Sequence, residues 1–209
     1  MASANERRAD RRLKIIDAAV EVLADKGFHQ ARISDIAQRA GVADGTIYLY
    51  FQNKEDLLIS IFEEKMELLL TNLHRALEGV KRPQARIARF AQFHFEQVQS
   101  NPAVAAVLQV ELRLSNKFLK EYRPKKLWEY LEVFAQIVSN GQEEGVFRKD
   151  IDPFTAMWSF FGALDELAMQ WVLTKPSRRF SLPASAEQVA AIFTGGLRHQ
   201  PQENTVEVP

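Results

Sequence analysis

The stretch ISDIAQRAGVADGTIYLYF, which spans residues 33–51, decides the fold of the N-terminal part of the chain. Its apolar residues recur at helical spacing in two short segments, and Gly41 lies between them. Because glycine adopts a left-handed turn at little steric cost, we expect the chain to reverse there. Ser34 and Asp44 stand where the two short helices need N-cap acceptors. This layout predicts a helix-turn-helix.

The second short segment has an outward face with hydroxyl groups, one apolar side chain and little bulk at its start. Its residues are Gly45, Thr46, Tyr48, Leu49 and Tyr50. Such a face is suited to a DNA groove, where hydroxyls bind phosphates and apolar groups meet thymine methyls.

The composition is that of an ordinary water-soluble domain, with 46% apolar and 26% charged residues in 209. No apolar run approaches the roughly 20 residues that span a bilayer, so we expect no membrane partner. The polar N-terminus does not resemble a secretory signal. The chain has no cysteine, which excludes disulfides and thiolate metal sites. These features predict a cytoplasmic protein.

The net charge of +0 neither favours nor opposes a nucleic-acid partner, because it hides a local bias. The first fourteen residues carry five cations against two carboxylates. Further cations surround the helix-turn-helix, namely Lys26, Arg32, Arg39 and Lys54. A protein that must leave DNA on demand needs only modest phosphate attraction.

The apolar spacing is helical almost throughout, which predicts an all-α fold of about nine helices. We expect an N-terminal arm and three-helix DNA-binding domain in residues 1–53, a larger ligand-binding and dimerisation domain in 54–200, and a disordered tail in 201–209. The expected boundaries are a stop at Gly27, a cap at Asn53, proline-led starts at Pro83, Pro102 and Pro153, a stretch opened by Ser115 and Asn116 and kinked at Pro124, and a last helix over 184–198.

The helix that follows Asp152-Pro153 is apolar around its whole circumference. Such a helix needs cover on more than one face, and a second subunit can supply part of it. A second subunit packed against the last two helices is one source of that cover.

Residues 13–57 resemble the DNA-binding domain of the TetR family of repressors. The matching motifs are DIA at 35–37, AGV at 40–42, GTIYLYF at 45–51 and NKEDLL at 53–58. The resemblance implies a homodimer that places two recognition helices in successive major grooves of a pseudo-palindromic operator, roughly 34–36 Å apart. It also implies a C-terminal domain whose ligand pocket controls the separation of the two DNA-binding domains in the dimer.

By this resemblance, several residues match positions that touch DNA: Arg32, Ser34, Thr46, Tyr48, Tyr50 and Lys54. Lys54 and the hydroxyls suit phosphate oxygens, Gly45 permits a close approach, and Leu49 suits a thymine methyl. Ser34 also reads as a plain helix cap, and Tyr48 as a packing residue that anchors the turn. Asp44 either caps its own helix or accepts a hydrogen bond from cytosine N4, and capping is the favoured interpretation.

The segment QVELRLSN at 109–116, together with GVADGTIYLY at 41–50, resembles the FadR-type regulators of fatty-acid degradation within this family. That resemblance implies a repressor of fatty-acid degradation genes that long-chain acyl-coenzyme A releases from its operator. The acyl-coenzyme A is then an effector, and no cofactor is expected.

The ligand site is predicted on the helix that starts at Pro83. Arg86 and Arg89 precede Phe90, Phe93 and His94, an order that suits an anionic head group and an apolar tail. The remaining candidates are apolar residues of the body and one arginine: Leu108, Leu112, Arg113, Trp128, Leu131, Phe134, Trp158, Phe161 and Leu164. The alternative is ordinary, with solvated arginines and aromatic residues in the core.

Enzyme motifs are absent from the sequence: it has no glycine-rich phosphate loop, no nucleophile elbow and no histidine pair at metal-ligand spacing. His94 and Glu111 form a dyad only if their helices touch, and a core histidine is the simpler interpretation. We therefore expect neither catalytic nor metal-binding residues. Two rival functions remain, a repressor that senses another hydrophobic molecule and a helical enzyme or lipid carrier that retains the N-terminal head.

Overall fold

The computed structural model describes residues 3–114, 121–174 and 180–198. Within these ranges the chain forms nine α-helices and one 3-10 helix, with no strand, which confirms the all-α prediction. The elements are α1 (Ala4–Gln30), α2 (Ile33–Ala40), α3 (Asp44–Ile47), α4 (Lys54–Leu77), α5 (Pro83–Ser100), α6 (Pro102–Gln109), η1 (Glu111–Leu114), α8 (Lys125–Glu143), α9 (Pro153–Leu173) and α10 (Leu182–Leu197).

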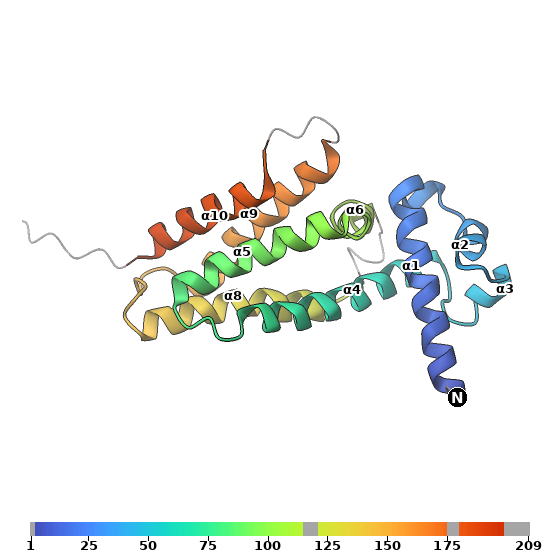
Figure 1. The fold of residues 1–209 in the computed structure, drawn as a ribbon, viewed down its shortest axis with the longest axis horizontal. Coiled ribbons are helices and arrows are strands. Elements are labelled where there is room, and N and C mark those ends of the chain that lie inside the picture. Colours follow the sequence, from blue (N-terminus) through green and yellow to red (C-terminus); the bar gives the residue numbers. More distant parts are fainter. Residues whose placement is uncertain (1–2, 115–120, 175–179, 199–209) are drawn as a thin grey trace, which may run out of the picture.

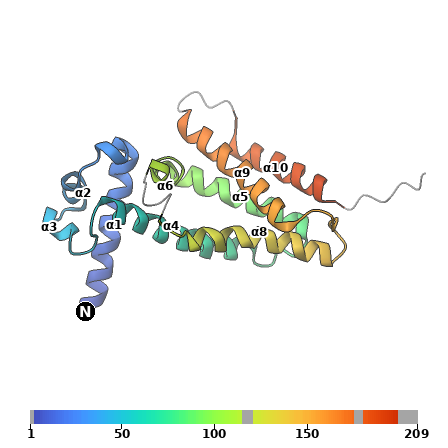
Figure 2. The ribbon, with the colours of Figure 1, turned by 180° about the vertical axis from the view of Figure 1, so that it is seen from behind.

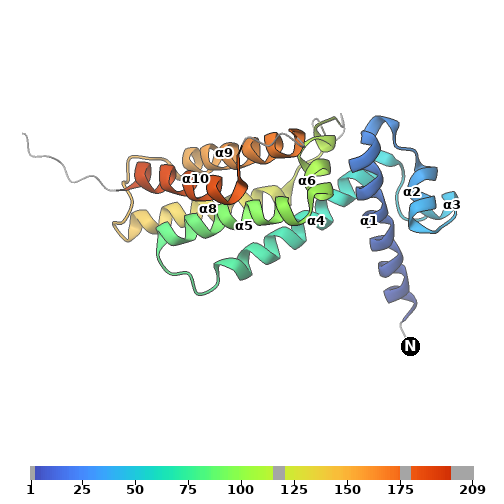
Figure 3. The same cartoon turned by 45° about the horizontal axis from the view of Figure 1, so that its top comes forward.

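The molecule is elongated, with α1–α3 forming a head at one end and the remaining helices forming a body (Figure 1). Helix α4 runs from the head along the body, and the short α6 lies at the end of the body that faces α1. The view from behind shows the same order, with α4 and α8 on the side opposite α9 and α10 (Figure 2). Figure 3 shows α9 and α10 side by side along one edge.

Glycine sets two of the bends in the head. Gly41 has a φ of 67° and ends α2, as its position in the sequence predicts. Gly27 has a φ of 76° and interrupts the helical backbone of α1 where the sequence predicts a stop, but one more helical turn follows the kink and α1 ends at Gln30.

The predicted caps of the two short helices are wrong. Helix α2 begins one residue before Ser34, and the Asp35 carboxylate accepts a hydrogen bond from the Arg32 N–H at 3.0 Å. Helix α3 begins at Asp44, with Ala43 in the N-cap position. Asp44 therefore lies in the first turn, where a carboxylate interacts favourably with the helix dipole without capping the backbone.

The cap predicted at Asn53 is confirmed, whereas the Asn101 side chain makes no capping hydrogen bond at the start of α6. The Asn53 side chain accepts from the Asp56 N–H at 2.8 Å, and the Asp56 carboxylate accepts from the Gln52 N–H at 2.9 Å. Asp152 likewise accepts from the Thr155 N–H at 2.9 Å at the start of α9. Of the predicted stretch around Ser115 and Asn116, residues 115–120 lie outside the described residues, as does the tail 201–209.

The core of the body is aromatic. Phe134 and Phe160 stack with ring centroids 3.9 Å apart, and Phe90 lies 5.0 Å from Tyr130 and 5.5 Å from Phe160. Helix α5 carries Phe90 and packs against α4, α6, α8, α9 and α10. No helix of the described residues is long and apolar enough to cross a membrane.

Candidate DNA-binding surface and ligand cavity

The helix-turn-helix buries one face and exposes the other, as its spacing predicts. Ile36, Ala37, Ile47 and Phe51 are buried in the head. The opposite face of α3 and the turn after it presents Tyr48, 58% exposed, and Leu49, 72% exposed. A large apolar side chain that is three-quarters exposed has no role in packing the monomer.

The other residues predicted to contact DNA differ in how exposed they are. Arg32, Ser34, Asp44 and Gly45 are exposed, while Thr46 and Tyr50 are half-buried. The Arg8 guanidinium lies 5.9 Å from the centre of the Tyr50 ring, so the N-terminal part of α1 borders the same surface. The structure thus brings these residues of α1, α2 and α3 to one end of the molecule (Figure 1).

Lys54 is the exception. Its ammonium donates to the carbonyl oxygens of Phe28 and, at 2.9 Å, Ala31, and it lies 4.6 Å from the centre of the Phe28 ring. These carbonyls belong to the turn that follows Gly27, which leaves them without helical partners. The geometry therefore does not support the phosphate contact predicted for Lys54, because its ammonium already binds the backbone.

The body contains a cavity of about 250 Å³ between α4, α5, α6, η1, α8 and α9. Its wall is mainly apolar, with a few polar side chains. The lining residues are Phe62, Lys65, Met66, Leu68, Leu69, His94, Gln97, Val98, Asn101, Val104, Ala105, Leu108, Gln109, Leu112, Arg113, Leu127, Tyr130, Phe161 and Asp165. Of the predicted ligand residues, the structure brings His94, Leu108, Leu112, Arg113 and Phe161 together here.

Helix α4 also lines the cavity, and no residue of this helix was among the ligand-binding residues predicted from the sequence. Phe62, Met66 and Leu69 continue its apolar stripe into the cavity wall. Lys65 lies within the same wall. A lysine inside an otherwise apolar stripe is the feature of the sequence that could have indicated a charged group in this wall.

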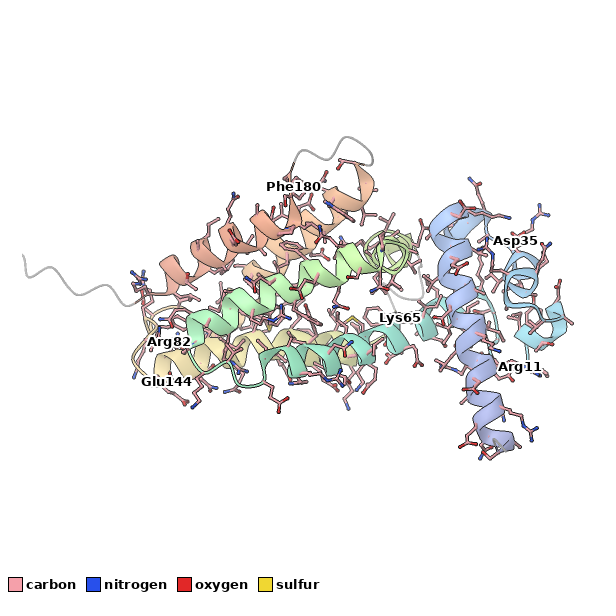
Figure 4. All side chains as sticks on the ribbon, in the orientation of Figure 1. Arg11, Asp35, Lys65, Arg82, Glu144 and Phe180 are labelled. Carbon is pink, nitrogen blue, oxygen red and sulfur yellow. The ribbon has the colours of Figure 1, made fainter. Side chains whose placement is uncertain are left out.

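The predicted head-group site at Arg86 and Arg89 is not supported. Arg86 donates to the carbonyls of Leu77 and Val80, at 3.3 and 3.1 Å, and so closes the end of α4. Arg89 forms an ion pair with Glu96 at 3.0 Å. Both arginines belong to the first turns of α5. Figure 4 shows that Arg82, at the start of this helix, lies at the end of the body away from the head, whereas Lys65 of the cavity wall lies near the head.

The other predicted ligand residues also lie outside the cavity wall. Phe90, Phe93, Leu131, Phe134 and Leu164 are buried in the core, in line with the ordinary interpretation. Trp128 and Trp158 are 40% and 39% exposed, and they form an aromatic cluster with Phe154. A helical repeat places residues on a face, but it does not say what that face packs against.

The cavity has two cations, and each has a carboxylate partner. Lys65 pairs with Asp17 of α1 at 2.7 Å, and Arg113 pairs with Asp165 of α9. Lys65 is the more buried of the two, with 19% of its side chain exposed against 47% for Arg113. Through Lys65, a residue of the cavity wall is bonded directly to the head.

His94 and Tyr130 form a neutral pair deep in the cavity wall. His94 Nδ1 lies 2.9 Å from the Tyr130 hydroxyl. Burial lowers the pKa of His94 to about 4 and raises the pKa of Tyr130 above its ordinary value, because both charged forms would lose their hydration. Both groups are therefore uncharged at neutral pH.

His94 and Glu111 do not form a dyad, because each side chain has another partner. His94 is a buried residue of the body, as the simpler interpretation predicts. The Glu111 carboxylate accepts from the Phe28 N–H at 2.6 Å. Glu111 opens η1, whose next two residues, Leu112 and Arg113, line the cavity. This bond links η1, and through its next two residues the cavity wall, to α1, beside the direct Lys65–Asp17 pair.

Comparison with known proteins matches the two parts of this molecule separately. Residues 15–61 match the profile of bacterial regulatory proteins of the tetR family. Residues 62–196 match the profile of the C-terminal region of YsiA-like proteins.

Similar proteins cover nearly the whole chain. A fatty acid metabolism regulator protein of Bacillus subtilis (strain 168) is 36% identical over 188 residues, which are 90% of this chain and 96% of that protein. The solved structure of the fatty acid degradation regulator FadR from Bacillus halodurans is 39% identical, with a TM-score of 0.82 over 91% of this chain and 97% of that one. FadR from Bacillus subtilis, solved in complex with stearoyl-CoA, is 36% identical, with a TM-score of 0.82 over 89% of this chain and 99% of that one.

These relatives are transcriptional regulators, which confirms the expectation of a regulator in place of an enzyme. The alignments with these relatives cover 90% and 91% of this chain, so the similarity includes both the head and the body. The chain belongs to the TetR family of bacterial transcriptional regulators.

Proposed function

We propose that this protein is a homodimeric repressor of fatty-acid degradation genes, working in the cytoplasm, that leaves its operator when long-chain acyl-coenzyme A binds. The observation that carries the proposal is an apolar cavity bonded to the DNA-binding head in two places, directly at the wall residue Lys65 and through Glu111, which precedes the wall residues Leu112 and Arg113 in η1. The similar regulators from Bacillus support the class of genes, and the stearoyl-CoA bound to one of them supports the class of ligand.

The operator contact would be made by the exposed face of α2 and α3. Tyr48 and Leu49 are large, exposed side chains of the head and are suited to base edges, including a thymine methyl. Arg32, Ser34, Thr46 and Tyr50 are suited to phosphates beside them. Gly45 permits close approach, and Asp44 either reads a cytosine or only adds to the helix dipole.

The dimer would form through α9 and α10, which lie side by side on one edge of the body (Figure 3). Ile192 on α10 is 69% exposed, and Phe154 on α9 is 53% exposed. Exposed small residues accompany Ile192 along α10, including Ala191, Gly195 and Gly196. Small side chains allow a partner helix to approach closely, and burying the larger ones would stabilise the dimer by about 25 cal/mol per Å².

The ligand would place its acyl chain in the cavity and its phosphates at the rim. Each buried methylene contributes about 0.8 kcal/mol, so affinity is expected to rise with chain length until the cavity is full. Lys65 and Arg113 are the cations of the cavity wall, and an arginine can hold a phosphate with two hydrogen bonds.

Release would follow from competition for these cations. A phosphate at Lys65 displaces Asp17, which loosens α1 from α4, and a phosphate at Arg113 displaces Asp165 and moves η1. A change in the position of η1 would then weaken the Glu111 bond to Phe28. A coupling of about 1–3 kcal/mol between ligand and DNA is enough to switch a repressor severalfold.

The test is an operator-binding assay at fixed salt, titrated with acyl-coenzyme A of increasing chain length, bare coenzyme A and free fatty acid. We expect only the long-chain thioesters to release the operator at low concentration. Equal release by the free fatty acid would instead indicate a sensor of apolar molecules in general. Loss of sequence preference as salt is raised would contradict operator binding itself.

A further inference from the structure

Two polar side chains are buried in the cavity wall and have an atom with no hydrogen-bond partner. His94 is 7% exposed and Gln109 is 8% exposed. Within the described residues, neither His94 Nε2 nor Gln109 Oε1 makes a hydrogen bond. Burying a polar atom without a partner destabilises the folded protein, so such atoms in a ligand cavity point to a group that the ligand supplies.

The chemistry of His94 Nε2 follows from its neighbour. Tyr130 keeps its proton, because burial raises the pKa of the phenol. The contact with His94 Nδ1 allows either group to donate, but donation by Nδ1–H would leave both the phenol proton and Nε2 without a partner. We therefore assign the donor role to the Tyr130 hydroxyl, which leaves only Nε2 unpaired. The imidazole is neutral and carries a single proton, which must then be on Nε2. His94 therefore offers an N–H donor to the cavity, and Gln109 offers a carbonyl acceptor.

In a long-chain acyl-coenzyme A, the first polar groups that follow the alkyl tail include both a hydrogen-bond acceptor and a donor. Its alkyl tail has no hydrogen-bonding atom, and its phosphates are too strongly hydrated for the interior. At the junction between them lie the thioester carbonyl, which only accepts, and the first pantetheine amide, whose N–H donates. We propose that His94 Nε2–H donates to the thioester carbonyl and that Gln109 Oε1 accepts from that amide N–H, so this pair distinguishes a thioester from a merely apolar ligand.

This assignment rests on the proposed function and adds the recognised group to it. An apolar ligand would leave both buried atoms unpaired, and a site built to hydrogen-bond its ligand rejects analogues that lack the matching group. The pair would also fix the position of the thioester, and with it the distance from the acyl chain to the phosphates at Lys65 and Arg113.

The experiment compares stearoyl-coenzyme A with S-octadecyl-coenzyme A, a thioether that keeps the chain, the sulfur and the pantetheine but lacks the carbonyl oxygen. Calorimetric titration of the full-length protein should show the thioester binding about tenfold more tightly, the value of one good hydrogen bond. The double substitution His94→Phe with Tyr130→Phe should abolish that preference, and it leaves no phenol without its partner.

Gln109→Met should weaken both ligands by the same factor, about fivefold to tenfold, since both contain the amide. The ligand-free variant should unfold at the same temperature as the wild type or higher, because it loses an unpaired buried oxygen. A merely structural glutamine would give the opposite, a lower unfolding temperature with unchanged affinity. Gln99→Met, the same change at an exposed position outside the cavity, is the matched control and should alter neither.

Equal affinity of the wild type for thioester and thioether would overturn the role of His94, and it needs no variant to be folded. Unchanged binding of stearoyl-coenzyme A by Gln109→Met would overturn the role of Gln109. In both cases the proposed function stands, because acyl-coenzyme A still binds. If the wild type fails to bind stearoyl-coenzyme A at all, the proposed ligand and this assignment fail together.

Discussion

His94 makes the stability of the folded protein depend on pH. Its pKa is about 4 in the folded state and 6.5 in a solvated chain, so between these values the unfolded state binds a proton that the folded state does not. The free energy of unfolding therefore falls as the pH drops from 6.5 toward 4, by at most about 3 kcal/mol from this residue.

Urea unfolding of the wild type and His94→Gln at several pH values measures this contribution. Glutamine can keep a hydrogen bond to Tyr130 but does not titrate, so its unfolding free energy should depend less on pH across this window. Parallel curves for the two proteins would contradict the assignment.

Lys54 is expected to stabilise the head and not to bind DNA. In Lys54→Met the carbonyls of Phe28 and Ala31 lose their donor, and we expect the free energy of unfolding to fall by about 1–3 kcal/mol. The salt dependence of operator binding, measured on the folded variant, should stay the same. Unchanged stability with a salt slope reduced by about one unit would indicate a phosphate contact instead.

The sequence indicated which side chains of the head are buried, but not which groups the cations bind. The buried positions Ile36, Ile47 and Phe51 were predictable, because the helical spacing within each short segment places them on its inward face. The partners of Lys54 and Arg86 are backbone carbonyls that only the folded chain brings near. In a sequence, a lysine or arginine that binds backbone carbonyls cannot be distinguished from one that binds a phosphate.

Among the elements, η1 links the cavity to α1 through Glu111, in addition to the direct pair of Lys65 on α4 with Asp17. Glu111 holds the Phe28 N–H with a charged acceptor, and replacing it with neutral glutamine weakens the bond by about 1 kcal/mol while the shape is kept. We expect Glu111→Gln to be released from the operator at an acyl-coenzyme A concentration about fivefold lower than the wild type.

Fluorescence anisotropy of labelled operator, titrated with stearoyl-coenzyme A, measures the concentration of half-release. The control is Glu144→Gln, which makes the same change at an exposed residue of the body end that is remote from the head (Figure 4). An identical half-release concentration for Glu111→Gln and Glu144→Gln would exclude η1 as the link.

The helices themselves were largely predictable, because prolines at Pro83, Pro102 and Pro153 and caps at Asn53 and Asp152 act locally. The cavity was predictable only in part. Which face of α4 lines it depends on how α4 packs against α5 and α8. The cations of its wall, Lys65 and Arg113, therefore lie on α4 and η1, whereas the sequence pointed to two arginines of α5.

For the whole molecule, the exposed edge formed by α9 and α10 predicts a dimer. Ile192→Arg places a charge where a second copy would bury it without a partner, so we expect a monomer with severely weakened operator binding. Sedimentation measures the mass. Glu132→Arg, on α8 at the opposite side of the body, should remain dimeric, and a dimeric Ile192→Arg would contradict this interface (Figure 1).

The spacing of the two heads is the quantity that the ligand is expected to change, and the absence of cysteine makes it measurable. A single Gln52→Cys substitution, on the exposed turn before α4, places one spin label on each head of a dimer. Pulsed electron paramagnetic resonance then gives the label-to-label distance for the operator-bound dimer, and again after stearoyl-coenzyme A or bare coenzyme A is added. We expect stearoyl-coenzyme A to shift the distance beyond the width of the operator-bound distribution and bare coenzyme A to leave it in place; an unchanged distance while stearoyl-coenzyme A releases the operator would contradict control by head spacing.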